Sequence, residues 1–384
     1  MDITIQPKKL RGSVRVIPSK SQAHRLLICA ALADSPTTIF CGETNRDIEA
    51  TAECLRALGA TIRRTESGYQ VCPISQVPEM AVLNCRESGS TLRFLLPIVG
   101  ALGVDAVIRM EGRLPQRPLS PLWEEMERMG CTLTRPTPDT IRCTGSLRQG
   151  DYSIAGNVSS QYISGLLFAQ RILGGCTLTV TGKVESAPYI EMTRRALDLF
   201  ADQAPGEIAV EGDWSNGAFW MAAANLGSDV TILGLDPASA QGDRAADHWL
   251  PRLREHCTID ASDIPDLVPI LSVTAAANQG AVFTSIGRLR LKESDRVEST
   301  IAMLTALGGQ AEATEDTLTV FGTGLRGGTV DAVNDHRIAM SAAIAATVCA
   351  EPVTILCAQC VEKSYPKFWA EYARLGGQYE FNLR

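Results

Sequence analysis

Basic and small polar residues gather where helices are expected to begin. In "VIPSKSQAHR" (residues 16–25), Lys20 and Arg25 flank serines that could cap a helix continuing through "QAHRLLICAALA". The unpaired N–H groups of a first turn favour negative charge, so Lys20 weakens the helix unless an anion lies nearby. The stretch is compatible with a solvated basic helix start, or with a site where N–H groups, hydroxyls and cations bind a phosphate.

Four further helix starts share this chemistry. They are "ESGSTLRF" with Ser88 and Gly89, "NVSSQYISGLL" with Ser159, Ser160 and Gln161, "LKESDR" with Lys292 and Glu293, and "NDHR" with Asn334, Asp335, His336 and Arg337. Each alone is an ordinary helix cap. Together they predict helix N-termini directed at one anion-binding pocket.

The elements that would position these groups repeat along the chain. A helix ending in Leu-Gly or a similar pair is followed by two β-like stretches at Cys54, Glu125 and Met303, and a shortened copy ends the sequence. The turns "TESGY", "TPDT" and "TEDT" are typical of hairpins. After "MTRRALDLF" and "LPRLREH" there is room for little more than one strand. The sequence therefore predicts two domains of three α/β units, with two of the six units lacking a hairpin.

Composition limits the classes of function. The chain has 384 residues, is 45% hydrophobic and 21% charged, and carries a formal charge of −7. These values indicate a globular protein and argue against a nucleic-acid binder. No apolar run reaches the roughly 20 residues of a membrane span, and the first residues lack the core of a signal peptide. The twelve cysteines are scattered, and Cys357 and Cys360 lack the partners of a zinc site. We expect a cytoplasmic protein without a metal.

The motifs, in their order along the chain, resemble those of the 5-enolpyruvylshikimate-3-phosphate (EPSP) synthase family. The resemblance runs from end to end and depends most on "LKESDR", "NDHR" and "VEKSYPKFW". It implies an α/β fold, a two-domain inside-out α/β barrel of six βαβαββ-like units. The first domain would comprise residues 20–211 and the second residues 1–19 plus 212–384, with the active site in the cleft between them.

The resemblance also implies a reaction, in which the enolpyruvyl group of phosphoenolpyruvate is transferred to the 5-hydroxyl of shikimate-3-phosphate. A phosphoenolpyruvate site would comprise Lys20, Gly89, Arg117, Gln161, Arg296, His336, Arg337 and Lys363. A shikimate-3-phosphate site would comprise Lys20, Ser21, Arg25, Ser159, Ser160, Gln161, Ser186, Tyr189, Asp266 and Lys292. Both ligands carry a phosphate and a carboxylate, which fits this density of cations.

In the implied mechanism, Asp266 faces the hydroxyl and Glu293 protonates the methylene carbon of phosphoenolpyruvate. Lys20 and Lys363 share the proton transfers, and His336 completes the catalytic set. No cofactor is expected, and the protein is expected to act as a monomer on the two small molecules. The resemblance further implies inhibition by glyphosate beside Gly89, where the absence of a Cβ predicts open space.

Two other functions are compatible with the sequence. The sister enolpyruvyl transferase acting on UDP-N-acetylglucosamine usually has a cysteine general acid in the loop that holds Arg117, and "RLPQRP" contains none. A catalytically silent anion-binding homologue would explain the shortened units but not the retained charged residues.

Overall fold

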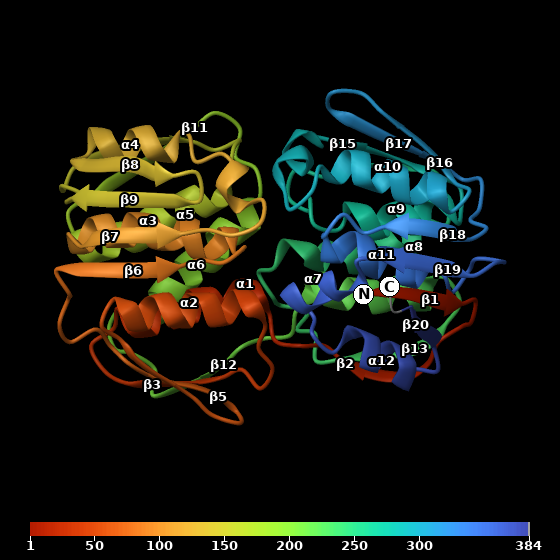
Figure 1. Cartoon of the computed structure of the whole chain (residues 1–384), viewed down its shortest axis with the longest axis horizontal. Coiled ribbons are helices and arrows are strands. Elements are labelled where there is room, and N and C mark those ends of the chain that lie inside the picture. Colours follow the sequence, from red (N-terminus) through yellow and green to blue (C-terminus); the bar gives the residue numbers. More distant parts are fainter. Residues whose placement is uncertain (383–384) are drawn as a thin grey trace. The chain divides into compact units, whose positions relative to one another are not determined.

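The computed structural model describes residues 1–382, and it divides into two compact units. Unit 1 comprises residues 1–17 together with the chain from residue 212 onward, and unit 2 comprises residues 18–211. Each unit is a mixed α/β assembly (Figure 1), which confirms the predicted α/β class.

Residues 18–211 form three sheets, with strand orders β6-β7-β9-β8, β12-β3-β5-β4 and β10-β11. Their strands are β3 (Thr37–Phe40), β4 (Thr61–Arg64), β5 (Gly68–Cys72), β6 (Met80–Asn84), β7 (Asp105–Arg109), β8 (Cys131–Thr137), β9 (Thr140–Gly145), β10 (Asp151–Ala155), β11 (Thr177–Thr181) and β12 (Glu207–Ala209). Their helices are α1 (Lys20–Ala31), α2 (Arg46–Ala57), α3 (Gly89–Leu102), α4 (Leu122–Arg128), α5 (Ser160–Leu173) and α6 (Ala187–Leu199), with a short turn of 3₁₀ helix, η1 (Leu114–Gln116).

The described part of unit 1 also forms three sheets, ordered β18-β19-β1-β20, β14-β15-β17-β16 and β13-β2. Their strands are β1 (Asp2–Gln6), β2 (Arg11–Arg15), β13 (Asp229–Leu233), β14 (Cys257–Asp260), β15 (Ala281–Thr284), β16 (Gln310–Ala313), β17 (Thr317–Phe321), β18 (Gly328–Asp331), β19 (Val353–Leu356) and β20 (Gln378–Asn382). Their helices are α7 (Trp214–Asn225), α8 (Ala246–Arg252), α9 (Val268–Ala276), α10 (Arg296–Ala306), α11 (His336–Ala345) and α12 (Phe368–Arg374), with η2 (Gly242–Ala245), η3 (Gly287–Leu291) and η4 (Ala358–Lys363).

Each four-stranded sheet joins a parallel pair to an antiparallel pair, which is a hairpin in three of the sheets and the pairing of β1 with β20 in the fourth. In unit 2, β6 pairs in parallel with β7, and β8 and β9 form the hairpin. Across residues 1–382, two sheets lack an antiparallel pair and consist of one parallel pair each, β10 with β11 and β2 with β13. They correspond to the two shortened repeats. One strand, β12, follows α6 and pairs with β3, and one strand, β14, follows α8 and pairs with β15. Both strands are therefore part of four-stranded sheets.

The helices at the centre of each unit are largely apolar and buried. Every residue of α9 and α11 is buried, as are residues 89–100 of α3 apart from Ser90. The sheets lie outside these helices (Figure 1). A helix that is apolar on all sides is stable only when it is covered on every side, so the polar groups at the helix starts are held by a rigid core.

One predicted helix start is wrong. The sequence suggested that a helix begins near Lys292 and Glu293, whereas α10 begins at Arg296. Asp295 is the better cap, because its Oδ1 accepts the N–H groups of Val297 and Glu298 at 3.1 and 3.2 Å. Lys292 and Glu293 therefore lie in the segment between η3 and α10.

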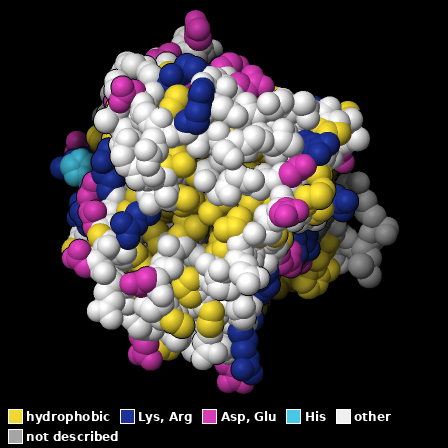
Figure 2. Space-filling model, turned by 90° about the vertical axis from the view of Figure 1, so that its left-hand side faces the viewer, with side chains coloured by type: hydrophobic (Ala, Val, Ile, Leu, Met, Phe, Trp, Pro, Cys, Tyr) yellow, Lys and Arg dark blue, Asp and Glu magenta, His cyan; other side chains and the backbone are white. Residues whose placement is uncertain are grey.

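In the described residues, no helix combines the length and the apolar character needed to cross a membrane. The face of unit 2 shown in Figure 2 carries hydrophobic side chains in a central hollow, with basic and acidic groups scattered around it. Scattered charges of both signs do not make an anion site.

Candidate active site

In unit 2, serines cap the three predicted helix starts. The Oγ atoms of Ser19, Ser88 and Ser159 accept N–H groups of the first turns of α1, α3 and α5, at 3.3, 3.2 and 3.3 Å. Ser160 and Gln161 follow in the first turn of α5. These bonds confirm the predicted caps, and they leave the other first-turn N–H groups to attract an anion.

Lys20 is held by a carboxylate that the sequence reasoning did not identify. Its Nζ lies 3.1 Å from Oδ2 of Asp47, and the two side chains are 17% and 18% exposed. Asp47 occupies the first turn of α2, which Asn45 caps by accepting the N–H groups of Asp47 and Ile48. The cap signal "TN" before "RDIEA" is visible in the sequence, but the pairing of Asp47 with Lys20 is not.

Two guanidinium groups crowd the beginning of α3. A Cβ at Gly89 would lie 2.7 Å from Nη1 of Arg117 and 3.1 Å from Nη1 of Arg93. The expectation of open space beside Gly89 is therefore wrong, because Arg117 fills it. Arg93, also missed, donates to Oε1 of Gln161 at 2.8 Å, and Nε2 of Gln161 donates to Ser90 Oγ at 2.9 Å.

Arg25 connects α1 to α6. Its guanidinium donates to the carbonyls of Ser21 and Tyr189 at 2.6 and 2.8 Å, and to Oγ1 of Thr193 at 2.8 Å. Burial lowers the pKa of Arg25 to about 10, which still leaves it charged at neutral pH. Ser186, at a φ of 56°, begins α6 next to these contacts. The structure thus brings together Ser21, Arg25, Ser186 and Tyr189 in unit 2.

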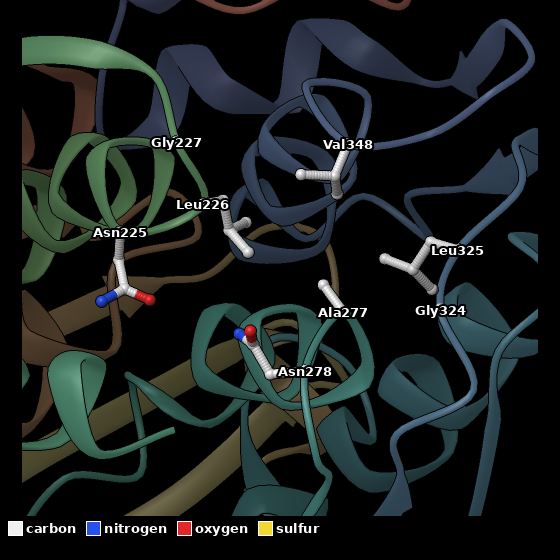
Figure 3. A pocket seen from close by; sticks show the side chains of 8 residues that line it. All are labelled: Asn225, Leu226, Gly227, Ala277, Asn278, Gly324, Leu325 and Val348. Carbon is white, nitrogen blue, oxygen red and sulfur yellow. The ribbon is translucent and has the colours of Figure 1, made fainter. Parts of the chain in front are cut away.

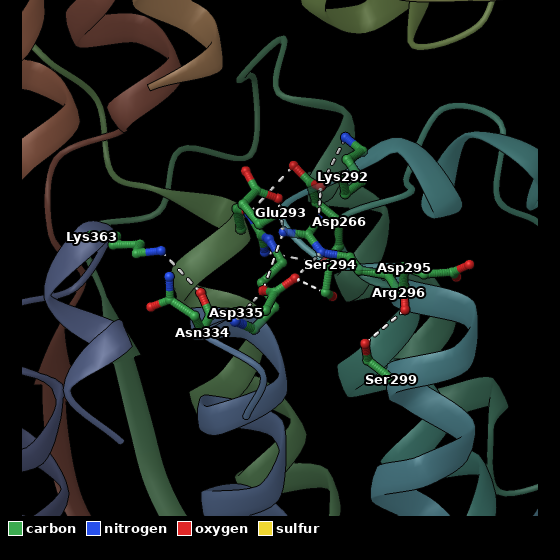
Figure 4. Close-up of polar contacts among 12 residues, drawn as sticks. Asp266, Lys292, Glu293, Ser294, Asp295, Arg296, Ser299, Asn334, Asp335 and Lys363 are labelled. Atoms are coloured by element: carbon green, nitrogen blue, oxygen red, sulfur yellow. Dashed lines mark hydrogen bonds and ion pairs between the residues drawn. The ribbon is translucent and has the colours of Figure 1, made fainter. Parts of the chain in front are cut away.

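In unit 1, Asp266 is surrounded by three cations, of which Lys292 and Arg296 are labelled in Figure 4. Lys292 Nζ and Arg296 Nη1 lie 3.2 and 2.6 Å from its Oδ1, and Arg337 Nη2 lies 3.4 Å from its Oδ2. Burial by itself would raise the pKa of the Asp266 carboxyl, but Arg337, Lys292 and Arg296 outweigh it and hold that pKa well below its ordinary value. Asp266 does not cap α9, whose N-cap residue is Leu267.

The guanidinium of Arg296 is the centre of this cluster. Besides Asp266 it contacts Glu293 Oε2 at 2.5 Å and Asp335 Oδ2 at 2.8 Å. Arg296 and Asp335 are 1% and 0% exposed, and Ser294 Oγ donates to Asp335 at 2.9 Å. Burial alone would lower the pKa of Arg296, but its carboxylate neighbours raise it. Sequence reasoning quoted Asp335 in "NDHR" without giving it a role.

The remaining cations begin α11 or lie near it. His336 and Arg337 follow the cap Asp335 and are buried. Arg337 Nη2 donates to Ser215 Oγ, on α7, at 2.6 Å, and Nη1 donates to the Asp266 carbonyl at 3.1 Å. Lys363 Nζ donates to the Asn334 carbonyl at 3.0 Å (Figure 4). Three helix N-termini of unit 1 therefore converge on one charged cluster.

The opposite ends of α7, α9 and α11 line a separate cavity of about 420 Å³ (Figure 3). Its walls are Asn225, Leu226, Gly227, Ala277, Asn278, Gly324, Leu325 and Val348. At 1.5 Å per residue, helices of this length put the cavity more than ~10 Å from the charged cluster. It carries no ionisable side chain in its lining and is not part of the candidate site.

In the part of the chain that the structure describes, no three His, Cys, Asp or Glu side chains are grouped as metal ligands. Cys357 is exposed, Cys360 is buried, and both are free thiols.

Two solved structures with the same fold are EPSP synthases. The structure resembles that of EPSP synthase from Acinetobacter baumannii with a TM-score of 0.80 and 23% identity, covering 99% of this chain and all of the other. A second structure of EPSP synthase from the same organism gives a TM-score of 0.79. The fold is therefore that of the EPSP synthase class of α/β proteins.

The sequence comparisons are more specific. The family model of EPSP synthase (3-phosphoshikimate 1-carboxyvinyltransferase) matches residues 5–261 and 255–372. The enzyme of that name from Clostridium kluyveri is 36% identical over 98% of this chain and 97% of its own. That from Clostridium perfringens is 37% identical over 98% of both chains. The chain belongs to the EPSP synthase family.

Proposed function

We propose that the protein transfers the enolpyruvyl group of phosphoenolpyruvate to the 5-hydroxyl of shikimate-3-phosphate, releasing phosphate. Family membership supports this reaction, which belongs to the shikimate pathway of aromatic amino-acid biosynthesis. The observation that carries it is the cluster around Asp266, where an ionised carboxylate is within 3.4 Å of three cationic side chains. Such a cluster supplies a proton acceptor beside groups that bind anions.

Each part of this cluster has a role in the proposed reaction. The hydroxyl oxygen adds to C2 of phosphoenolpyruvate while its proton passes to Asp266, and Glu293 protonates C3. The C2–O bond to phosphate then breaks while the Glu293 carboxylate takes a proton back from C3, which restores the double bond and releases phosphate. A carboxylate with a low pKa is a weak base. An anionic substrate that draws Lys292 and Arg337 away from Asp266 would raise that pKa, so binding prepares the base.

The two ligand sites draw on both units. For phosphoenolpyruvate we propose Lys20, Gly89, Arg117 and Gln161 of unit 2 with Arg296, His336, Arg337 and Lys363 of unit 1. For shikimate-3-phosphate we propose Lys20, Ser21, Arg25, Ser159, Ser160, Gln161, Ser186 and Tyr189 of unit 2 with Asp266 and Lys292 of unit 1. The capped helix starts of each unit support these assignments.

The finer architecture is part of the proposal. We propose two domains, residues 20–211 and residues 1–19 plus 212–384, built as inside-out α/β barrels with the active site in the cleft between them. The protein would act in the cytoplasm as a monomer and without a cofactor. The sheets outside buried helices in each unit support the barrel description.

Phosphate release with each acceptor tests the reaction. Purified protein is incubated with phosphoenolpyruvate and shikimate-3-phosphate, with phosphoenolpyruvate and UDP-N-acetylglucosamine, or with phosphoenolpyruvate alone. We expect phosphate and an enolpyruvyl ether only in the first mixture. Turnover in the second would favour the sister transferase, and binding without turnover in any mixture would favour a silent anion-binding protein.

A further inference from the structure

A chain of buried hydroxyls connects His24 to the beginning of α3. His24 Nδ1 lies 2.7 Å from Thr51 Oγ1, which lies 2.7 Å from Thr91 Oγ1. Thr91 Oγ1 donates to Ser88 Oγ, the cap of α3, at 2.7 Å. These four residues are at most 1% exposed. One network therefore connects α1, α2 and the cap of α3.

The position of the proton on the His24 imidazole determines which group donates in each hydrogen bond of the network. Nε2 of His24 has no hydrogen-bond partner among the described residues. If Nε2 carried the proton, a buried N–H donor would be left unsatisfied, which costs more than an unused lone pair. The single proton of a neutral ring therefore belongs on Nδ1, which donates to Thr51. Thr51 then donates to Thr91, and Thr91 donates to Ser88.

The ring is also held neutral. Burial, Lys20 and Arg25 each lower the pKa of His24, which lies well below its ordinary value. Asp47 contacts the network only through its backbone carbonyl, and its carboxylate is paired with Lys20 rather than with the imidazole. A protonated ring would also carry a second N–H, on the buried Nε2, which has no partner among the described residues.

We propose that His24, as its neutral Nδ1–H tautomer, is a positioning residue that fixes the N-terminus of α3 through Thr51, Thr91 and Ser88. The inference rests on the proposed function, because α3 begins at Gly89, which we assign to phosphoenolpyruvate. Thr91 Oγ1 also lies 3.4 Å from the carbonyl oxygen of Asp47. The network thus connects two of the places where unit 2 presents cations, the Lys20–Asp47 pair and the start of α3.

The first test is spectroscopic and does not depend on activity. The chain has four histidines, so ¹⁵N-labelled wild type and His24→Asn identify the His24 ring by difference. We expect a protonated-type nitrogen at Nδ1, an unprotonated type at Nε2, and no titration between about pH 5 and 8, where an ordinary histidine titrates. A proton on Nε2, or a ring that titrates in this range, would overturn the proposal.

The second test is kinetic. Thr51→Val interrupts the network while keeping the shape of the side chain, and we expect the KM for phosphoenolpyruvate to rise about tenfold, the scale of one buried hydrogen bond. We expect kcat and the KM for shikimate-3-phosphate to change by less than about threefold. The matched control is Thr37→Val, since Thr37 Oγ1 is buried in the same unit and has no partner among the described residues. Equal kinetics in the two valine variants would refute the positioning role.

Two variants of His24 complete the design. The side-chain amide introduced by His24→Asn can replace the Nδ1–H donor, so the KM of this variant should stay within about threefold of wild type, whereas His24→Leu should match Thr51→Val. If both behave alike, the imidazole only fills space and the proposal fails. If wild type shows no enolpyruvyl transfer with either acceptor, the proposed function fails, while the ¹⁵N measurement still decides the tautomer.

Discussion

The proposed assignment of Lys292 to shikimate-3-phosphate predicts that the binding of this substrate depends on pH between about pH 7 and 9. Its side chain is 19% exposed. Burial lowers its pKa from 10.5 to about 8, although Asp266 opposes the change. About nine-tenths of the molecules then carry a charged Lys292 at pH 7, and about one-tenth at pH 9. If the charged form binds the substrate anion, the KM for shikimate-3-phosphate should rise about tenfold between these pH values.

Steady-state kinetics at saturating phosphoenolpyruvate measure this change. The substrate phosphate has its second pKa at about 6, so this group stays mainly dianionic and the carboxylate stays ionised throughout. The control is Lys292→Arg, which remains charged and should give a nearly constant KM. A constant KM in wild type, or the same rise in Lys292→Arg, would refute the reasoning. The lowered pKa also means that the unfolded chain binds more protons between about pH 8 and 10.5, so this group makes stability rise with pH in that range.

Three further outcomes are expected. Lys20→Ala and Glu293→Ala should each lower kcat by at least about 100-fold, the usual effect of removing a charge-stabilising or acid–base group; near-wild-type turnover would remove that residue from the mechanism. Gly89→Ala should raise the KM for phosphoenolpyruvate as well as the inhibition constant of glyphosate, because the new methyl would displace Arg117; an unchanged KM would show that the guanidinium yields freely. Asp335→Asn should lower the free energy of unfolding by about 3 kcal/mol, measured in urea, since it breaks a buried ion pair but keeps a capping oxygen; a loss below about 1 kcal/mol would contradict this.

Local features of the fold were predictable from the sequence. Ser88 and Ser159 cap helices in the structure because a cap needs only groups two or three residues apart. The start of α10 was predicted too early. Asp295 follows other polar residues, and the sequence alone does not show which of them caps the helix. The hairpin turns follow equally from local residue types.

The partners of the site residues were not predictable in the same way. Asp335 contacts Arg296 across 39 residues, and Asp47 contacts Lys20 across 27. Periodicity shows that such residues begin helices, but not which carboxylate meets which cation. The packing of Arg117 against Gly89 is also a tertiary contact. Because the sequence does not show this contact, open space was expected where the guanidinium of Arg117 lies.

The pairing of β1 has a consequence for synthesis on the ribosome. Residues 2–6 pair with β19 and β20, at residues 353–356 and 378–382, whereas unit 2 is a single continuous stretch. At about 5–20 residues per second, the first strand waits roughly 20–70 seconds for its partners. Ile3 and Ile5, fully buried in the finished protein, are exposed during that time, while unit 2 is already able to fold. Residues 2–6 are thus translated long before the strands with which they pair, and their sheet can be completed only when the last strands are available.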